Sequence, residues 1–255
     1  TGTSSTDFIT RTAAQTITGT LNANLATGEV VKVSLNNGGT WQTATATEGS
    51  NTFTLSGVTL TGNNTLLVRV EDAAGNAGTS TTQAYVLDTT APTTTVSTVV
   101  FSNDTGTSTT DFVTKNPSQT INGTLSAALA AGEVVKVSLD NGATWKTADA
   151  GANNTFSLSG VTLTGSNTLK VQVEDSAGNP GPVLSQAYIL DTTAPTMVVS
   201  NLSFSNDTGT STTDFLTNNS SQTISGTLSA PLAFGEVVKV SLRSEEHTSE
   251  LQSRF

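Results

Sequence analysis

The sequence has no cysteine and only one histidine, His247, among its 255 residues. Without thiols the chain forms neither disulfides nor thiolate metal sites, so its fold must depend on packing or on hard metal ions. The lone histidine lies in a C-terminal segment that differs from the rest of the chain. Neither a Ser-His-Asp nor a Cys-His arrangement is therefore available for nucleophilic catalysis. The sequence predicts a protein that is not an enzyme.

Basic residues and long apolar runs are also scarce. Lys and Arg number 10 against 20 Asp and Glu, which gives a formal net charge of −10 at pH 7. Nucleic acids and anionic membranes are bound through Lys/Arg patches, so we expect neither as a partner. No run of 18 apolar residues occurs, and we expect no membrane insertion. The N-terminal "TGTSSTDF" lacks the pattern of a signal peptide.

Internal repeats dominate what the sequence does contain. "TGTSSTDF" at residues 1–8 returns as "TGTSTTDF" at residues 105–112 and 208–215. "GEVVKVSL" begins at residues 28, 132 and 235, a period of about 103 residues, which suits an independent domain rather than a solenoid unit. We predict four segments: residues 1–90 form a repeat that lacks its first strand, 91–194 a complete repeat, 195–242 a truncated repeat, and 243–255 a tail.

The tail differs from everything upstream of it. "RSEEHTSELQS" (Arg243–Ser253) resembles the conceptual translation of a short-read sequencing adapter, the alternative being a genuine variant end. We interpret it as non-native, so His247 is not a candidate catalytic residue. A first repeat that starts late and a third that breaks off predict an excerpt of a longer array.

The complete repeat has the pattern of an all-β domain. Short runs rich in β-branched residues alternate between apolar and polar positions, and turn signals such as "DNG" (Asp140–Gly142) separate them. We predict a tandem array of immunoglobulin-like, seven-stranded β-sandwiches. The expected strands are residues 96–102, 119–126, 133–139, 144–149, 154–160, 167–175 and 183–191.

Four motifs, in order, carry a family resemblance: "DTGTSTTDFVT", "GEVVKVSLDNGATW", "VEDSAGN" and "LDTTAP". Over residues 1–242 the chain resembles the bacterial Ig-like repeats of giant surface adhesins, both biofilm-associated and RTX-type. The resemblance implies a stalk or adhesive array on a bacterial surface. It also implies calcium between domains, which members of such families often bind.

Strand order places the acidic motifs at the ends of each sandwich. The loop "NDTGTSTTDF" (Asn103–Phe112) and the end of the last strand share the end where the chain leaves the repeat. "EDSAGN" (Glu174–Asn179) lies at the opposite end, facing the previous repeat. Clustered carboxylates repel one another unless a hard cation neutralises them, and Ca²⁺ takes six to eight oxygen ligands. The candidate calcium ligands are Asp7, Asp88, Asp104, Asp111, Asp175, Asp191, Glu174 and Asn179. The alternative is that Asp and Asn form ordinary turns and that "DTTAP" is only a turn with a stiff linker.

We predict structural spacer repeats of a bacterial cell-surface or secreted adhesin, located outside the cell. The expected partners are neighbouring repeats of the same chain, with an unknown surface ligand bound through terminal domains that the sequence lacks. One alternative is a set of carbohydrate-binding sandwiches of a secreted hydrolase. Such modules present rows of exposed aromatic rings, whereas this chain has two Trp and two Tyr. A tail-fibre or S-layer component is a third interpretation.

Overall fold

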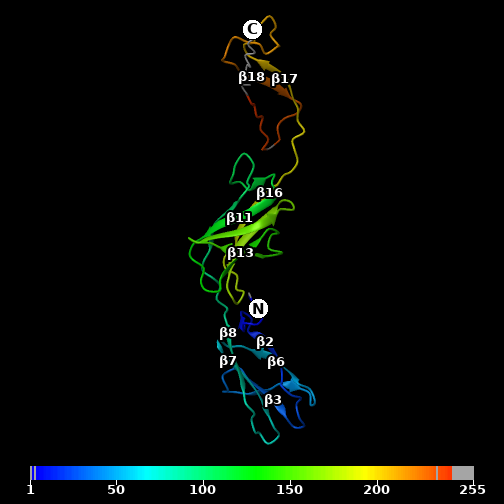
Figure 1. The fold of residues 1–255 in the computed structure, drawn as a ribbon, viewed down its shortest axis with the longest axis vertical. Helices are drawn as coiled ribbons and strands as arrows, with labels where there is room; N and C mark the ends of the chain where they lie inside the picture. Colours follow the sequence, from blue (N-terminus) through cyan, green and yellow to red (C-terminus); the bar gives the residue numbers. More distant parts are fainter. Residues whose placement is uncertain (1, 3, 234, 243–255) are drawn as a thin grey trace, which may run out of the picture. The chain divides into compact units, whose positions relative to one another are not determined.

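The computed structural model describes residues 2, 4–233 and 235–242, and the predicted tail with His247 lies outside them. The described residues form β-strands, turns and loops without a helix (Figure 1). The chain divides into two units, residues 1–191 and residues 192–255. The first unit contains the first and second repeats, and the second unit contains the third.

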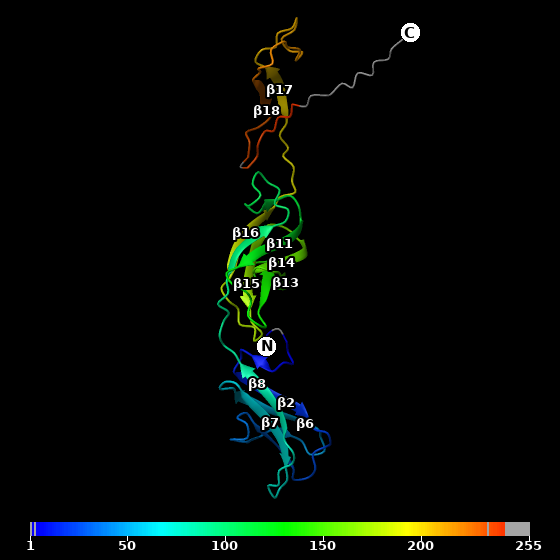
Figure 2. The same ribbon diagram turned by 60° about the vertical axis from the view of Figure 1, so that its left-hand side comes forward.

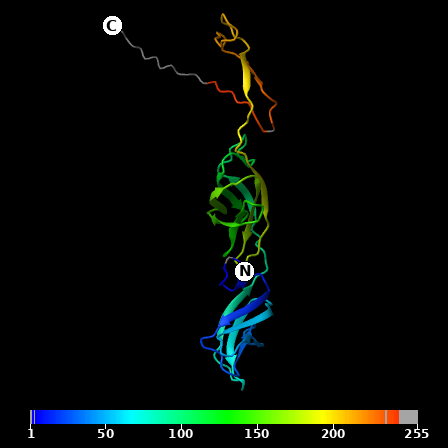
Figure 3. The same cartoon turned by 90° about the vertical axis from the view of Figure 1, so that its right-hand side faces the viewer.

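The second repeat is a complete β-sandwich (Figure 2). One layer pairs the first, second and fifth strands of the predicted set, and the other pairs the third, sixth and seventh. The fourth strand joins the layers, because its start pairs with the third strand and its end with the fifth. Figure 3 shows these strands enclosing the interior of the repeat. In chain order they are β9 (Val96–Phe101), β11 (Ser118–Leu125), β12 (Val134–Ser138), β13 (Lys146–Ala150), β14 (Thr155–Thr162), β15 (Asn167–Glu174) and β16 (Leu184–Leu190).

One strand differs from the prediction of seven antiparallel strands. Val113–Thr114 forms a short strand, β10, which pairs in parallel with β16 through Val113↔Ile189 and Thr114↔Leu190. A strand of two residues is too short to show a period of two, so the sequence pattern gave no sign of it. The first repeat has the same feature, with β1 (Ile9–Thr10) parallel to β8 (Thr81–Leu87).

Alternation along the strands builds the core of the second repeat. In β11 every second side chain faces inward, and Ile121 is completely buried. The turn between β12 and β13 uses Asn141 and Gly142 at φ of 59° and 95°, which the "DNG" signal predicts. Fully buried residues of this core include Ile121, Val135, Val137, Leu169, Val171 and Val173.

The first repeat has the same order of strands but begins at β1. Its strand β2 therefore pairs on one side only, with β6, whereas β11 pairs with both β14 and β9. A second, separate core lies between its layers. The remaining strands are β2 (Ala14–Thr20), β3 (Val30–Ser34), β4 (Gln42–Thr43), β5 (Thr45–Ala46), β6 (Thr52–Thr59) and β7 (Asn64–Glu71).

The third repeat is a single hairpin-like pair, β17 (Val199–Phe204) with β18 (Ile224–Leu228). Its apolar side chains stay exposed, including Leu202 and Leu216 at 55% and 71%. Residues 235–242, which repeat the sequence around β12, do not form a strand. Their counterpart β12 is held by β13 and β15 in the second repeat, and this segment pairs with no strand among the described residues.

Candidate repeat junction and acidic loops

A tight turn follows the second-last strand of each of the first two repeats, at Asp72–Asn76 and at Asp175–Asn179. It is called the F–G turn below, and each copy folds around one Asp–Asn pair. In the second repeat the carboxylate of Asp175 accepts the backbone N–H and the side-chain amide of Asn179, both at 2.8 Å. The carboxylate of Asp72 accepts the same two groups of Asn76 in the first repeat, again at 2.8 Å. The Asn76 side-chain amide, followed by its backbone N–H, lowers the pKa of Asp72.

The F–G turn of the second repeat contacts the end of the first. Asn179 Nδ2 donates a second hydrogen bond, 2.8 Å long, to the carbonyl of Asp88 just after β8. The Arg11 guanidinium donates to the carbonyl of Gly178. Asp175 and Asn179 are 9% and 7% exposed. The two repeats therefore meet at a polar, hydrogen-bonded junction.

Glycine makes a close approach at this junction possible. Gly178 has φ of +87°, and a Cβ added to it would lie 2.9 Å from the Cα of Gly2. A Cβ on Gly2 would in turn overlap the carbonyl of Ser176. The turn and the start of the first repeat thus pack backbone against backbone.

The structure brings together some of the predicted calcium ligands at this junction. Asn179 lies against both Asp175 and Asp88. Its side-chain amide donates directly to the Asp175 carboxylate and to the Asp88 carbonyl, so these groups bind one another. Asp88 Oδ1 accepts the N–H of Thr90, as in an Asx-turn. Glu174 lies on β15 with its carboxylate 3.9 Å from Lys136 Nζ, which holds it in an ion pair.

Three other predicted ligands, Asp7, Asp111 and Asp191, lie just before a short parallel strand or just after the last strand. Asp7 and Asp111 occupy equivalent positions, and each accepts the N–H two residues further on. Asp191 lies just after β16, and its N–H donates to the carbonyl of Thr114. The loop before the short parallel strand and the end of the last strand therefore share one end of the sandwich, as the strand order predicts.

Asp104 is the least satisfied carboxylate of this loop. Its Oδ2 accepts the N–H of Phe112 at 2.9 Å, whereas its Oδ1 is buried and has no hydrogen-bond partner. Asp207, its equivalent in the third repeat, has the same orphaned oxygen. Buried polar atoms normally have hydrogen-bond partners, so we expect a hydrogen-bond donor or a cation beside each of these oxygens.

Further oxygen atoms face Gly106 in the same loop. A Cβ added there would lie 3.1 Å from the Val113 carbonyl, 3.6 Å from that of Ser108 and 3.8 Å from Asp111 Oδ1. Gly209 faces the equivalent three oxygens in the third repeat. Within the described ranges, no three His, Cys, Asp or Glu side chains form a group that could hold a metal ion. A cation in this loop would therefore depend on carbonyl oxygens as well as carboxylates.

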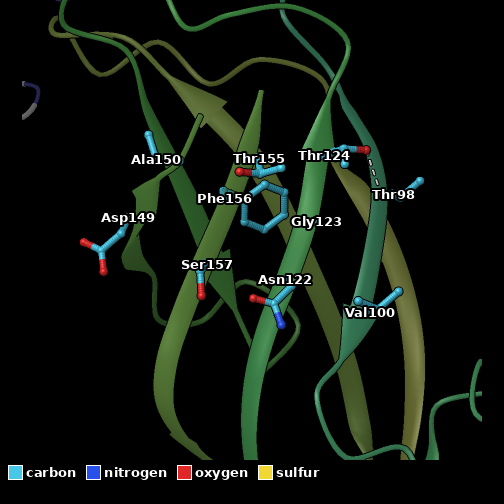
Figure 4. Close-up of a pocket in the computed structure, with 11 residues that line it drawn as sticks. Thr98, Val100, Asn122, Gly123, Thr124, Asp149, Ala150, Thr155, Phe156 and Ser157 are labelled. Carbon is cyan, nitrogen blue, oxygen red and sulfur yellow. Dashed lines mark hydrogen bonds between the residues drawn. The ribbon is translucent and has the colours of Figure 1, made fainter. Parts of the chain in front are cut away.

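A surface pocket on the second repeat lies over β9, β11 and β14 (Figure 4). Hydroxyl and amide groups such as those of Thr98, Thr124 and Asn122 line it, with Thr98 and Thr124 hydrogen-bonded at 2.7 Å. Its only aromatic ring, Phe156, lies against Gly123 and is 2% exposed. The pocket therefore offers no aromatic face on which a ligand ring would stack.

These features define the class of the protein as tandem Ig-like β-sandwich repeats, and the predicted all-β architecture is confirmed. A family model described as "Bacterial Ig-like domain" matches residues 1–89 and 90–192. The two matches cover more than half of the chain, so the chain belongs to the bacterial Ig-like domain family. No curated protein sequence matches it significantly. In the described part of the chain, no helix is long and apolar enough to cross a membrane.

Several solved structures are similar to part of the chain. Fibronectin(III)-like modules of Clostridium thermocellum CbhA are 14% identical, with 74% of this chain and 93% of that chain covered and a TM-score of 0.43. A biofilm-associated protein's BSP domain is 16% identical, with coverages of 73% and 29% and a TM-score of 0.24. A putative membrane-anchored protein from Corynebacterium diphtheriae is 15% identical, with coverages of 73% and 52% and a TM-score of 0.29. At TM-scores below 0.5, these similarities carry no functional argument.

Sequence reasoning missed three residues of the junction, Arg11, Gly2 and Gly178. Arg11 gives no repeat signal, because Lys115 and Asn218 occupy its equivalent positions. Gly178 does recur, as Gly75, and that recurrence within "AGN" is the signal that would have found it.

Proposed function

We propose that the chain consists of structural spacer repeats from a bacterial cell-surface or secreted adhesin, with a mechanical and non-catalytic role outside the cell. The observation that carries this proposal is the parallel pairing of a short, two-residue strand near the start of each sandwich with the strand that ends it. β1 pairs with β8, and β10 with β16. The family match and the acidic, cysteine-free composition support the same assignment.

Parallel pairing matters because of the direction in which tension acts on an array. In the second repeat, the N–H groups of Ile189 and Asp191 donate to the carbonyls of Phe112 and Thr114, each at 2.9 Å. Tension on the two ends of the repeat reaches β10 through β9 and the loop after it. It then slides β10 and β16 in opposite directions, so these bonds are loaded together in shear. A sandwich tied in this way resists extension until the pair separates.

Single-molecule pulling on the full chain tests the mechanical role. We expect each of the first two repeats to unfold in its own abrupt step, releasing roughly 3.3–3.6 Å of contour per residue. Ile189→Pro removes one donor of the β10–β16 pair and lowers the unfolding force of the second repeat. The first repeat, in which the N–H of Val86 donates to Phe8, serves as the control within the same molecule. Smooth extension at low force, with no steps, would contradict the proposal.

We also propose that calcium binds in the loop between β9 and β10. The buried Asp104 Oδ1 lacks a partner, and Asp111 Oδ1 with the carbonyls of Ser108 and Val113 faces Gly106 in the same loop. These oxygens would be the ligands, and they are of the kind that Ca²⁺ prefers. A bound divalent cation would neutralise these carboxylates and stiffen the loop. Calcium binding by Asp7, Asp88, Asp175, Asp191, Glu174 and Asn179 stays a prediction.

Calorimetric titration of calcium into the full chain tests the loop site. Asp104→Asn and Asp207→Asn together should remove the binding heat of the loop sites and reduce the calcium-dependent rise in melting temperature. Asp72→Asn is the matched control, since both oxygens of Asp72 already accept hydrogen bonds from Asn76. Absence of any calcium heat in the parent chain, or binding unchanged in the double variant, would overturn the loop assignment.

The alternative function is a carbohydrate-binding module of a secreted hydrolase. Sugar rings commonly stack on exposed aromatic side chains, and the pocket in Figure 4 has only the buried Phe156. Glycan-array binding above background would favour this alternative over a spacer.

A further inference from the structure

The two F–G turns have the same internal structure but opposite surroundings. In both, the Asp carboxylate binds the backbone and side-chain N–H groups of the Asn four residues later, at 2.8 Å. In the second repeat Asp175 and Asn179 are buried against the first repeat. In the first repeat Asp72 and Asn76 are exposed.

The glycine of each turn shows the same contrast. Gly75 and Gly178 have φ of +85° and +87°, so their backbones are alike. A Cβ on Gly178 would lie 2.9 Å from Gly2, whereas a Cβ on Gly75 would meet nothing within 4 Å. The backbone at Gly75 is therefore open to solvent, and it has the same conformation as the backbone at Gly178, which packs against Gly2.

The hydrogen-bonding groups of the first turn are likewise ready for a partner. Asn76 uses one Nδ2 hydrogen for Asp72, and its other hydrogen has no acceptor among the described residues. The equivalent hydrogen of Asn179 binds the Asp88 carbonyl. The Gly75 carbonyl corresponds to that of Gly178, which accepts the guanidinium of Arg11. Because Asp72 already fixes Asn76, little ordering remains to oppose binding.

We propose that the exposed turn Asp72–Asn76 is a docking surface for the trailing end of another bacterial Ig-like repeat. The partner supplies a backbone carbonyl after its last strand for Asn76, a cationic side chain for the Gly75 carbonyl, and a glycine that lies against Gly75. The second repeat has residues of this chemistry at the required positions: the Asp191 carbonyl, Lys115 and Gly106 are the equivalents of the Asp88 carbonyl, Arg11 and Gly2. The proposal rests on the spacer function and names the partner that such an array uses.

The test extends the full chain by a repeat of the required chemistry. Residues 90–207 are placed before residue 1, so the added Asp191 precedes Thr1 by the same spacing that separates Asp88 from Thr105. Amide hydrogen exchange by NMR then compares the two F–G turns. We expect exchange at residues 74–76 to slow by about tenfold or more relative to the 255-residue chain, approaching the rates at residues 177–179. Residues 177–179 of the same molecule provide the internal positive control.

Matched variants separate docking from general stabilisation. In the extended chain, Asn76→Ala should restore fast exchange at residues 74–75 only, and Asn179→Ala should act only on the second turn. Unchanged exchange at residues 74–76 beside a protected second turn would overturn the proposal. That result would leave the spacer function standing, since pulling tests the spacer function separately.

Discussion

The Asp140 carboxylate lies at the turn after β12 and accepts hydrogen bonds from three donors. The Thr144 hydroxyl donates at 2.5 Å, the Thr144 N–H at 2.8 Å and the Ser138 hydroxyl at 2.7 Å. These bonds favour the ionised form, and they lower the pKa of Asp140 from 3.8 to about 2, with Thr144 as the largest cause. Asn36 occupies this position in the first repeat and binds the Thr40 N–H without titrating.

We predict that Thr144→Val raises the pKa of Asp140 toward its ordinary value. The folded pKa lies below the unfolded one, so the ionised carboxylate stabilises the fold above about pH 3.8. That stabilisation disappears as the pH falls toward about 2. Carbon-detected NMR titration of the carboxylate measures the shift, with Thr40→Val as the control that leaves Asp140 unchanged. An unaltered Asp140 titration in the Thr144 variant would mean that these hydrogen bonds do not set its pKa.

Among the elements, the first strand decides how well each core closes. In the second repeat Phe101 of β9 packs edge-on against Phe112 and Tyr188, with ring centroids 4.9 and 5.7 Å away. Phe112 is consequently 7% exposed, whereas its equivalent Phe8 is 47% exposed. The first repeat has no counterpart of β9 among its described residues, and its β2 edge stays unpaired.

Side-chain truncations at equivalent positions of β2 and β11 measure how much a first strand such as β9 contributes to the stability of the core. Ile121 is completely buried, so Ile121→Ala should destabilise the second repeat by about 2–5 kcal/mol. Ile17, its equivalent, is only partly buried, so Ile17→Ala should cost the first repeat less than about 2 kcal/mol. Urea unfolding of each variant gives both values. Equal losses would show that pairing with a strand such as β9 does not affect how tightly the core packs at this position.

The strands and the placement of the F–G turns were predictable, because alternation and turn residues repeat in every copy. The seven longer strands of the second repeat lie close to their expected positions. β10 was not predictable, since two residues carry no period. At the junction, strand order predicted that Asp88 and Asn179 meet, but only the structure shows that Asn179 already satisfies both oxygens of Asp175. Side-chain pairing of this kind depends on rotamers that no sequence pattern encodes.

Across the first unit, the two repeats have unequal cores and a shared junction. Two residues, Leu25 and Leu55, are buried in the first repeat while their equivalents in the second are only partly buried. More residues are buried only in the second repeat: Val96, Phe101, Phe112, Ile121, Leu125, Val171 and Val173. Burial of apolar surface is the main stabilising term in folding, so the second repeat should be the more stable. Each repeat also contains one tryptophan, Trp41 or Trp145. Fluorescence therefore reports on each repeat separately when the other tryptophan is replaced.

We predict that the chain unfolds in urea in two steps, the first repeat before the second. Trp145→Phe leaves Trp41 as the reporter of the first repeat, and Trp41→Phe leaves Trp145 for the second, so the Trp145→Phe chain should show the lower midpoint. Asn179→Ala breaks the bond to Asp88 and should lower the Trp41 midpoint further, because the junction no longer supports the weaker repeat. Asn76→Ala, in the exposed equivalent turn, loses no contact between the repeats and controls for damage to the turn itself. Coincident midpoints in the two single-tryptophan chains would contradict the predicted difference in stability between the repeats. A Trp41 midpoint that Asn179→Ala leaves unchanged would show that the junction does not stabilise the first repeat.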